Sequence, residues 1–431
     1  MKSVEKTIVI MFFTFIALPL FAGGSAEKTV ETVTLWHSAQ GSNAAVFEEI
    51  AKTFNGTMGK EKNIAIEAVY QGKANDVLIK VNAASGTDSL PDIAMMDATA
   101  AIDMNHSDYL VTVDELGLDV SNILKSGISS YTSEKGLLAM PFNASALLYY
   151  YNKTLYDSLG IQPPKTLDEM RNAVEKTGKK DASGKLAVAG FAGIPATYEL
   201  TTFIGAQNGL SYMLNNRNGH DGAATEVLFG KEGTYRAFLE KWKAVYDTGF
   251  YNPIASGVID EFTSGRAAAI MASSSKLAAV KNAVGDDFEV GVARVPIVNE
   301  NATGGTVISG GALFSFKNND AVKTVLEYLV STDVQARWSE ATGYVPANTK
   351  TYETEKFRAF LAENPLYEVP VNALLESNPG LANVWIPSAY SIYYSFQANI
   401  IDVLNGKDLD EAVSDMEKIV NQAIVSYAEQ N

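Results

Sequence analysis

Short strand-like and helix-like segments alternate along this chain from residue 32 onward, and this alternation constrains its fold more than any other feature. Thr32–Trp36 has the composition of a short strand, and Asn43–Phe54 then carries apolar residues at helical spacing. Ile64–Tyr70 alternates as a second strand, and a helical pattern follows in Ala74–Ala84. The same reasoning predicts strands at 90–96, 267–272, 288–295 and 310–316, and helices at 167–176, 235–246, 277–283, 321–329 and 409–429. The sequence therefore predicts an α/β protein.

One extended stretch, Leu137–Tyr151, consists of two strand-like runs separated by Pro141-Phe142-Asn143. A broken extended segment of this kind suits a crossing of the chain from one lobe to another. A chain of 431 residues has room for two ordinary lobes or one oversized domain. Because the sequence contains no internal repeat, low-complexity tract or long linker, we expect two lobes joined by strands. Thr166, with Glu169 three residues later, predicts a capping box at the start of one helix.

Charge and cysteine content exclude several classes of function. The chain has 34 Lys+Arg against 50 Asp+Glu, a formal net charge of −16, and such a field repels a phosphate backbone or an anionic membrane. It has no cysteine, which excludes disulfides, thiolate nucleophiles, iron–sulfur clusters and cysteine-based zinc sites. The 3 histidines, His37, His106 and His220, are too widely spaced for a His-His metal motif. We therefore expect no metal, no other cofactor and no nucleic-acid partner.

The first 26 residues have the pattern of a secretory signal peptide. Lys2 and Lys6 give a positive start, and the run Thr7–Phe21 carries no charge but is short for a bilayer span. Small residues at positions 22–26 offer a cleavage point. We expect residues 1–26 to be removed and the mature protein to be periplasmic. The alternative is a membrane anchor that stays attached.

Signals for catalysis are weak. Ser273 and Lys276 fit the S-x-x-K pattern of a serine nucleophile, and Lys176-Thr177-Gly178 fits K-T-G. These two motifs occur in the reverse of the usual order, with no S-D-N element between them. His37 follows a predicted strand among polar neighbours, where an ordinary hydrogen-bonded histidine is the better interpretation than a catalytic base. We expect the chain not to be an enzyme, and a secreted serine hydrolase using Ser273 and Lys276 remains the alternative.

Signals for binding are stronger. Rings in loop-like settings could stack on a sugar or polyol or enclose a quaternary ammonium, although each can equally fill the core. Seven aromatic residues fall in such settings: Trp36, Phe142, Tyr344, Trp385, Tyr390, Tyr393 and Tyr394. Ser273–Ser275 precedes a predicted helix, where free N–H groups and hydroxyls can hold an anionic oxygen or simply cap the helix. Gly310-Gly311 allows a ligand to approach the backbone, or marks a bulge.

Eight short motifs, in one order along the chain, carry a resemblance to a known family. They are Leu35-Trp36-His37-Ser38, Pro141-Phe142-Asn143-Ala144-Ser145, Tyr150-Tyr151-Asn152-Lys153, Pro163-Pro164-Lys165-Thr166, Asp221-Gly222, Ala272-Ser273-Ser274, Gly310-Gly311-Ala312 and Thr342-Gly343-Tyr344-Val345-Pro346. With them the chain resembles the extracellular solute-binding proteins of ABC importers, in the sugar-binding cluster. Within that cluster it is most similar to the binders of glycerol-3-phosphate and glycerophosphodiesters.

The resemblance implies a periplasmic-binding-protein-like fold of two discontinuous α/β lobes, with a ligand cleft and a hinge between them. We expect lobe 1 to comprise residues 27–142 and 310–350, and lobe 2 to comprise 143–309 and 351–431. By position, Ser145, Ser273, Gly311 and Tyr344 would hold a glycerophosphate, and Asp97 would take the glycerol hydroxyls. The implied protein is a monomer without cofactor that delivers a polyol phosphate or sugar to the transmembrane permease subunits.

Three departures from the family pattern bear on the ligand. Tyr393 stands where the family has its phosphate-binding arginine, and Ala74 stands where it has a tyrosine, with Tyr70 close by. Loss of the arginine removes a bidentate, charge-assisted contact, so either helix N-termini and hydroxyls hold the anion or the ligand is uncharged. Leu167, where some members have tryptophan, would favour a larger diester or disaccharide. A di- or oligosaccharide stacked on Trp36, Trp385 and Tyr393 is the alternative. The expected ligand-binding set is Trp36, His37, Asp97, Ser145, Ser273, Gly311, Tyr344, Tyr393 and Trp385.

Overall fold

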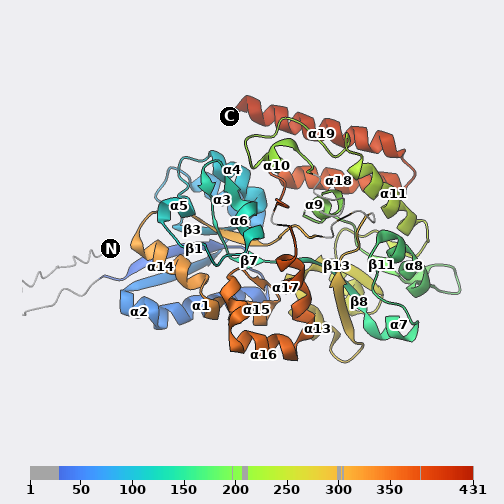
Figure 1. Ribbon diagram of the computed structural model, residues 1–431, viewed down its shortest axis with the longest axis horizontal. Coiled ribbons are helices and arrows are strands. Elements are labelled where there is room, and N and C mark those ends of the chain that lie inside the picture. Colours follow the sequence, from blue (N-terminus) through green and yellow to red (C-terminus); the bar gives the residue numbers. More distant parts are fainter. Residues whose placement is uncertain are drawn as a thin grey trace, which may run out of the picture.

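The structure is a computed structural model that describes residues 29–196, 198–205, 212–298, 302, 305–378 and 380–430. The expected signal peptide, residues 1–26, lies outside these residues. The elements form two separate five-stranded sheets covered by helices, which confirms the predicted α/β class (Figure 1). Within the described part of the chain, no helix combines the length and the apolar character that crossing a membrane requires.

The first sheet has the strand order β2-β1-β3-β15-β6. Its strands are β1 (Glu31–His37), β2 (Ile64–Tyr70), β3 (Ile93–Asp97), β15 (Gly311–Ser315) and β6 (Met140–Pro141). β1 runs parallel to β2 and β3, whereas β15 is antiparallel to β3. Helices α1 (Ser42–Gly56), α3 (Ala74–Ala84) and α14 (Asp320–Leu329) contact β2, β3 and β1 respectively. Their apolar faces bury the core predicted from helical spacing, with Phe47, Ile50 and Phe54 of α1 almost fully buried.

The second sheet has the order β12-β11-β13-β8-β14. Its strands are β8 (Leu147–Asn152), β11 (Phe191–Ala192), β12 (Tyr251–Asn252), β13 (Ala269–Ser273) and β14 (Val290–Arg294). Alternate side chains of β8 enter two different hydrophobic clusters, as the period of a strand requires: Leu147 and Tyr149 in one, Leu148 and Tyr150 in the other. Both faces of this sheet are therefore covered.

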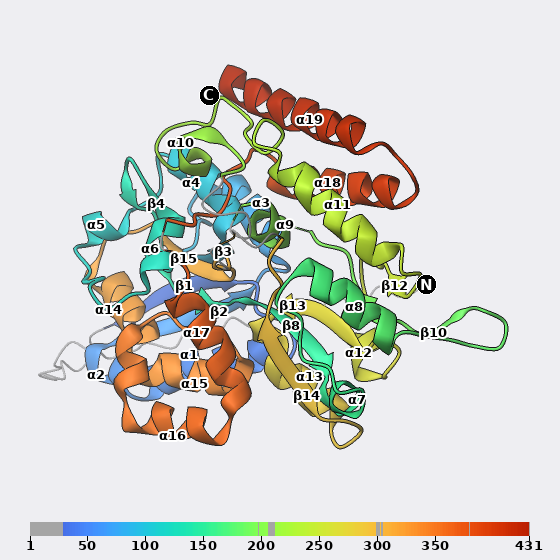
Figure 2. The same ribbon diagram turned by 45° about the vertical axis from the view of Figure 1, so that its right-hand side comes forward.

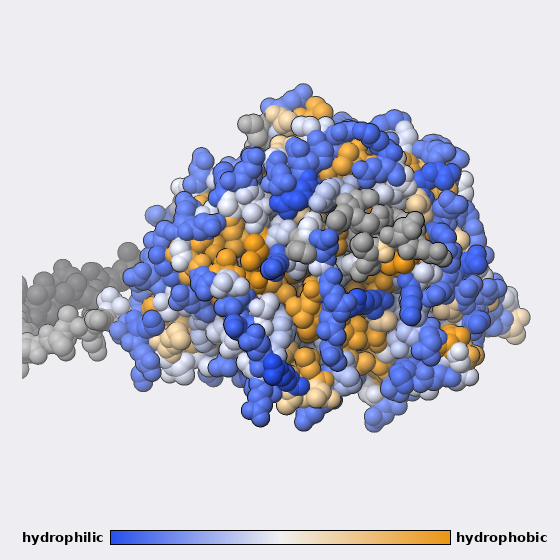
Figure 3. Space-filling model, viewed as in Figure 1, coloured by the Kyte–Doolittle hydropathy of each residue, from blue (hydrophilic) through white to orange (hydrophobic). Residues whose placement is uncertain are grey.

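Different helices cover those two faces. α8 (Leu167–Thr177), α11 (Thr234–Tyr246), α18 (Ala389–Leu404) and α19 (Leu409–Gln430) contribute to the cluster of Tyr149. α12 (Val258–Thr263), α13 (Leu277–Val284) and α17 (Glu368–Leu375) contribute to the cluster of Tyr150. Figure 2 shows α18 and α19 side by side along one margin of the molecule. On the face seen in Figure 3, hydrophilic residues cover the periphery and hydrophobic residues gather toward the middle.

The chain crosses between the sheets at short extended segments. β7 (Asn143–Ala144) follows β6 after one intervening residue, Phe142, and pairs with β16 (Val345–Pro346). Three residues pack outside the lobe in which the sequence places them: Trp385 joins the core of the first sheet, and Leu124 and Val345 join a core of the second. The expected lobe boundaries stay a prediction.

Two local predictions have clear outcomes. Thr166 caps α8, since its hydroxyl accepts a hydrogen bond from the Glu169 N–H at 3.1 Å. The predicted capping box is not complete, because the Glu169 carboxylate accepts from the Lys165 N–H at 2.6 Å and not from the Thr166 N–H. The loop-like setting expected for the aromatic residues was wrong for most of them. Trp36 lies in β1, and Tyr390, Tyr393 and Tyr394 lie in α18.

Candidate ligand-binding cavity

A cavity of about 260 Å³ is lined by residues at the carboxyl ends of β1 and β3, at the start of β15, and in two helices of the second part. The helices are α9 (Tyr198–Ile204) and α18. Cavities at the carboxyl ends of strands are a common place for ligands in α/β proteins. The lining is dominated by short polar side chains, two glycines and four tyrosines, Tyr198, Tyr344, Tyr390 and Tyr393.

Asp97 carries the one formal charge among the described lining residues. It ends β3, and its Oδ1 accepts from the Thr99 N–H at 3.0 Å and from the Thr99 hydroxyl, so the carboxylate caps the turn that follows the strand. Its Oδ2 accepts from the Tyr390 hydroxyl at 2.7 Å. This last contact joins the first sheet to α18. Oδ2 retains a lone pair for a ligand hydroxyl or cation, whereas the two contacts from Thr99 occupy both lone pairs of Oδ1.

The tyrosine hydroxyls of the cavity stay protonated. Burial, and then the charge of Asp97, raises the pKa of Tyr390, and burial is the largest cause of the raised pKa values of Tyr198 and Tyr344. Burial raises the pKa of Tyr393 to about 12. None therefore adds a negative charge at neutral pH, and the Tyr390 hydroxyl, which donates to Asp97, can still accept from a ligand.

Gly310 and Gly311 bring backbone close to the cavity wall. Gly310 has φ +114°, and a Cβ there would lie 1.6 Å from the Asn143 carbonyl oxygen, so this position requires glycine. The close approach is to Asn143 of the protein itself. Gly311 pairs with Asp97 in the sheet register, which sets the glycine beside the carboxylate.

A family model for the bacterial extracellular solute-binding proteins matches residues 49–367, which is most of the chain. The chain belongs to this family. It is 28% identical over 383 residues to the sn-glycerol-3-phosphate-binding periplasmic protein UgpB of Salmonella typhimurium, covering 84% of this chain and 85% of that one. To UgpB of Brucella abortus (strain 2308) it is 27% identical over 438 residues, covering 95% and 96%. These relatives confirm the resemblance seen in the motifs.

Solved structures share the fold of this solute-binding protein. UgpB from Mycobacterium tuberculosis in complex with glycerophosphocholine superposes with a TM-score of 0.73 at 19% identity, covering 92% of this chain and 99% of that one. The GacH receptor of Streptomyces glaucescens, solved unliganded and with acarbose, gives a TM-score of 0.76 at 21% identity, again covering 92% and 99%. The periplasmic-binding-protein-like fold expected from the sequence is thereby confirmed.

The solute-binding protein brings four residues of the expected ligand-binding set to the cavity: Asp97, Gly311, Tyr344 and Tyr393. Ser145 and Ser273 lie one residue contact away from it. Ser145 exchanges backbone hydrogen bonds of 2.7 and 2.9 Å with Ser309, which lines the cavity. The Ser273 hydroxyl hydrogen-bonds to Tyr198, another lining residue, and accepts from the Ser275 N–H at 3.2 Å.

Three further residues of the expected set are, like Ser145 and Ser273, outside the cavity lining. Trp36 packs against the first core, and His37 is fully buried with its ring centroid 5.0 Å from that of Phe47, where burial lowers its pKa. Trp385 is buried with its ring on His220, 3.9 Å between centroids. Leu167 likewise lies in the second core rather than at the cavity. The stacking platform expected from Trp36 and Trp385 is therefore not presented to this cavity.

Several lining residues were missing from the expected set. They include Tyr198, Tyr390, Asn143, Ser309 and Asn383. The spacing of Tyr390 and Tyr393 was a usable signal, since residues three apart share a helix face. The others come from segments that the chain fold brings together over long sequence separations.

The serine and lysine of the S-x-x-K motif do not contact each other as a nucleophile and its base would. The Ser273 hydroxyl lies 3.0 Å from the Ser275 hydroxyl and caps the turn at Ser274–Lys276, while the Lys276 side chain is exposed. Among the residues that the structure describes, no group of histidines and carboxylates could hold a metal ion.

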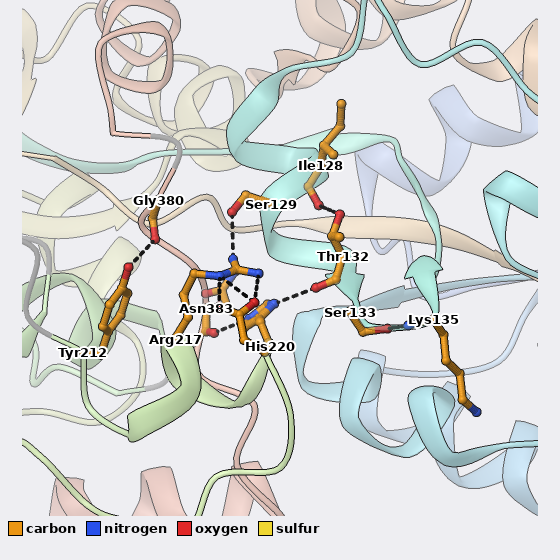
Figure 4. A network of polar contacts seen from close by, with 11 residues as sticks. Ile128, Ser129, Thr132, Ser133, Lys135, Tyr212, Arg217, His220, Gly380 and Asn383 are labelled. Atoms are coloured by element: carbon orange, nitrogen blue, oxygen red, sulfur yellow. Dashed lines mark hydrogen bonds and ion pairs between the residues drawn. The ribbon is translucent and has the colours of Figure 1, made fainter.

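A polar network beside the cavity joins α6 (Lys125–Tyr131) to α10 (Asn215–Gly219) and to residue 383 (Figure 4). Arg217 donates to the Ser129 hydroxyl at 3.2 Å and pairs with Asp221 at 2.9 Å. His220 Nδ1 lies 3.1 Å from the Thr132 carbonyl oxygen, and Nε2 lies 2.8 Å from the carbonyl oxygen of Asn383. We call these contacts the α6–α10 link. It ties the first part of the chain to a residue of the cavity wall.

Proposed function

We propose that this solute-binding protein captures a small polyhydroxylated ligand in the cavity and delivers it unchanged to the permease of an ABC importer. A glycerophosphodiester or glycerol-3-phosphate is the leading ligand class. Two observations support it: the curated relatives are named as sn-glycerol-3-phosphate-binding proteins, and Asp97, Gly311, Tyr344 and Tyr393 meet around one cavity. The relatives are binding proteins, in agreement with a function in transport rather than in catalysis.

The chemistry of the cavity suits a polyol. The Asp97 carboxylate accepts hydrogen bonds from hydroxyl groups, and a neutral tyrosine hydroxyl can accept a hydrogen bond as well as donate one. Ring faces of the tyrosines can pack against C–H groups or against a quaternary ammonium. A ligand with several hydroxyls and a compact carbon skeleton satisfies these groups together.

The charge of the cavity distinguishes between the two ligands of the leading class, glycerophosphodiesters and glycerol-3-phosphate. The described lining residues include no lysine or arginine, and their one charge is the carboxylate of Asp97. A phosphate monoester would carry up to two negative charges into this site without a charge-assisted donor. A glycerophosphodiester whose alcohol is cationic, such as glycerophosphocholine, has no net charge. We therefore place glycerophosphocholine ahead of glycerol-3-phosphate.

A saccharide is the second candidate, and the absence of a cation among the described lining residues favours it. A neutral sugar needs hydroxyl acceptors, hydroxyl donors and ring faces, all of which the cavity offers. With Trp36 and Trp385 outside the lining, stacking would fall to the tyrosines.

Isothermal titration calorimetry with glycerophosphocholine, glycerol-3-phosphate, maltose and trehalose tests the proposal. We expect one-to-one binding of glycerophosphocholine, and we expect Asp97→Asn to weaken it at least about tenfold, the effect of one charged hydrogen bond. Asp119→Asn is the matched control, because Asp119 caps a turn in the same way, accepting from Ser121 N–H at 2.9 Å, but does not line the cavity. Binding of maltose or trehalose instead would establish the second candidate. Failure of all four ligands would refute both.

A further inference from the structure

Asn143 has a buried side chain with an unused acceptor. It is 7% exposed and lines the cavity. Its Oδ1 has no hydrogen-bond partner, and its Nδ2 donates only to the Met95 sulfur at 3.1 Å, a weak acceptor. Buried amide groups are nearly always paired, so an unpaired one at a cavity wall indicates that a partner comes from the cavity.

Backbone contacts hold the main chain of Asn143 in place. β7 pairs with β16, where Asn143 faces Pro346 across the ladder. The Asn143 carbonyl oxygen packs against the Cα of Gly310, and this contact leaves no room for a Cβ on that glycine. These two contacts therefore fix the backbone position of Asn143 at the cavity wall.

A second unpaired group follows two residues later. The Ser145 hydroxyl is buried, in a residue 1% exposed, and has no hydrogen-bond partner in the described structure. In an extended segment, residues two apart face the same way. The segment 143–145 therefore presents two unpaired polar groups on one face.

Asn143 and Asp97 flank the same glycine. Gly311 is the register partner of Asp97, and a Cβ built on Gly311 would lie 3.7 Å from Asn143 Nδ2. Asn143 and Asp97 thus lie on either side of this glycine, at one end of the cavity. Acceptors bind ligand hydroxyls and repel phosphoryl oxygens.

We propose that Asn143 is a ligand-contact residue whose Oδ1 accepts a hydrogen bond from a ligand hydroxyl. The inference rests on the proposed function of the cavity and deepens it, because it orients the ligand. The hydroxyl-bearing end lies between Asn143 and Asp97, and any phosphodiester lies away from them. Asn143 thereby selects for hydroxyl donors at this end.

Asn143→Leu tests the inference, because leucine is of similar size and removes the unpaired amide. In the absence of ligand, we expect the melting temperature of the variant to equal or exceed that of the wild type, because the substitution removes an unpaired buried amide. We expect its affinity for the best ligand of the calorimetric panel to fall at least tenfold. A structural role alone would lower the melting temperature and leave the affinity unchanged.

Asn399→Leu is the matched control. Asn399 is buried, but its Oδ1 accepts from the Tyr235 hydroxyl at 2.8 Å and its Nδ2 donates to the Ala412 carbonyl at 3.1 Å. We expect this variant to melt at a lower temperature and to bind as the wild type does. The inference fails if Asn143→Leu melts as low as the control, or if it binds like the wild type. If the wild type binds no ligand of the panel, the proposed function fails, and the melting comparison still decides whether the amide is unpaired, which the inference requires.

Discussion

His220 makes the stability of this protein depend on pH in a defined direction. The side chain is 1% exposed within the α6–α10 link. Burial lowers the pKa of His220 to about 4, from 6.5, and the carbonyl groups of Asn383 and Thr132 oppose only part of that effect. The unfolded chain then binds a proton more readily than the folded one. The contribution of His220 to the free energy of unfolding is therefore complete above about pH 6.5 and is lost as the pH falls toward 4.

The magnitude follows from the two pKa values. The His220 pKa is 6.5 in the unfolded chain and about 4 in the folded protein. Proton linkage then lowers the free energy of unfolding by about 2 kcal/mol between pH 7.5 and pH 5. Asp221 does not disturb this window, because its pairing with Arg217 lowers the pKa of its carboxyl below its ordinary acidic value.

The assay is urea unfolding of the wild type and of His220→Gln at pH 7.5, 6 and 5. Glutamine does not titrate, so the difference between the two proteins isolates His220 from all other groups. We expect the wild type to lose about 2 kcal/mol more than the variant on going to pH 5. The reasoning would be refuted by an equal loss in both proteins. A larger loss in the variant would show that the two carbonyl oxygens hold an imidazolium bridging the link.

Three further substitutions probe the cavity and its surroundings. Gly310→Ala should lower the free energy of unfolding, measured in urea, by at least about 2 kcal/mol, because its Cβ would overlap the Asn143 carbonyl at a positive φ. Gly285→Ala is the control, also at positive φ but with open space around it, and should lower the free energy of unfolding by about 1 kcal/mol. Equal losses would contradict the contact between Gly310 and Asn143. Tyr393→Arg should raise the affinity for glycerol-3-phosphate about tenfold by calorimetry, and no change would remove the argument that a missing arginine disfavours phosphate. Ser129→Ala removes the hydrogen bond to Arg217 and should weaken ligand binding up to about fivefold if the α6–α10 link favours the ligand-bound arrangement. Unchanged affinity would show that the α6–α10 link contributes to stability but not to ligand binding.

Periodicity predicted most of the fold because it reports burial directly. The helix at 235–246 and the strand at 267–272 appear as α11 and β13 within two residues of the expected bounds. Reasoning from local setting failed for α18, where three tyrosines were expected in loop-like settings although Ile392, Phe396 and Ile400 recur at helical spacing. The helix places Tyr393 against the second core and leaves Tyr394 exposed. The buried residues of this helix recur at helical spacing, so the segment carried a helical signal that the prediction for its tyrosines overlooked.

The cavity was only partly predictable because it depends on contacts between distant segments. Asp97 and Gly311 were expected by position from the family resemblance, yet what joins them is the register of β3 and β15. Tyr390 reaches Asp97 across 293 residues of sequence. His37 and Trp385 show the opposite error: each stands in or beside a suggestive segment, but its ring is buried against another ring. No local pattern distinguishes a ring that faces a cavity from one that faces a core.

Native mass spectrometry of the protein mixed with glycerophosphocholine tests the central claim most directly. We expect a complex with one ligand of unaltered mass, and loss of that complex when Asp97→Ala and Tyr390→Phe remove the charge and the hydroxyl that meet in the cavity. A complex that survives both changes, or a ligand released with altered mass, would contradict capture without chemistry at this site.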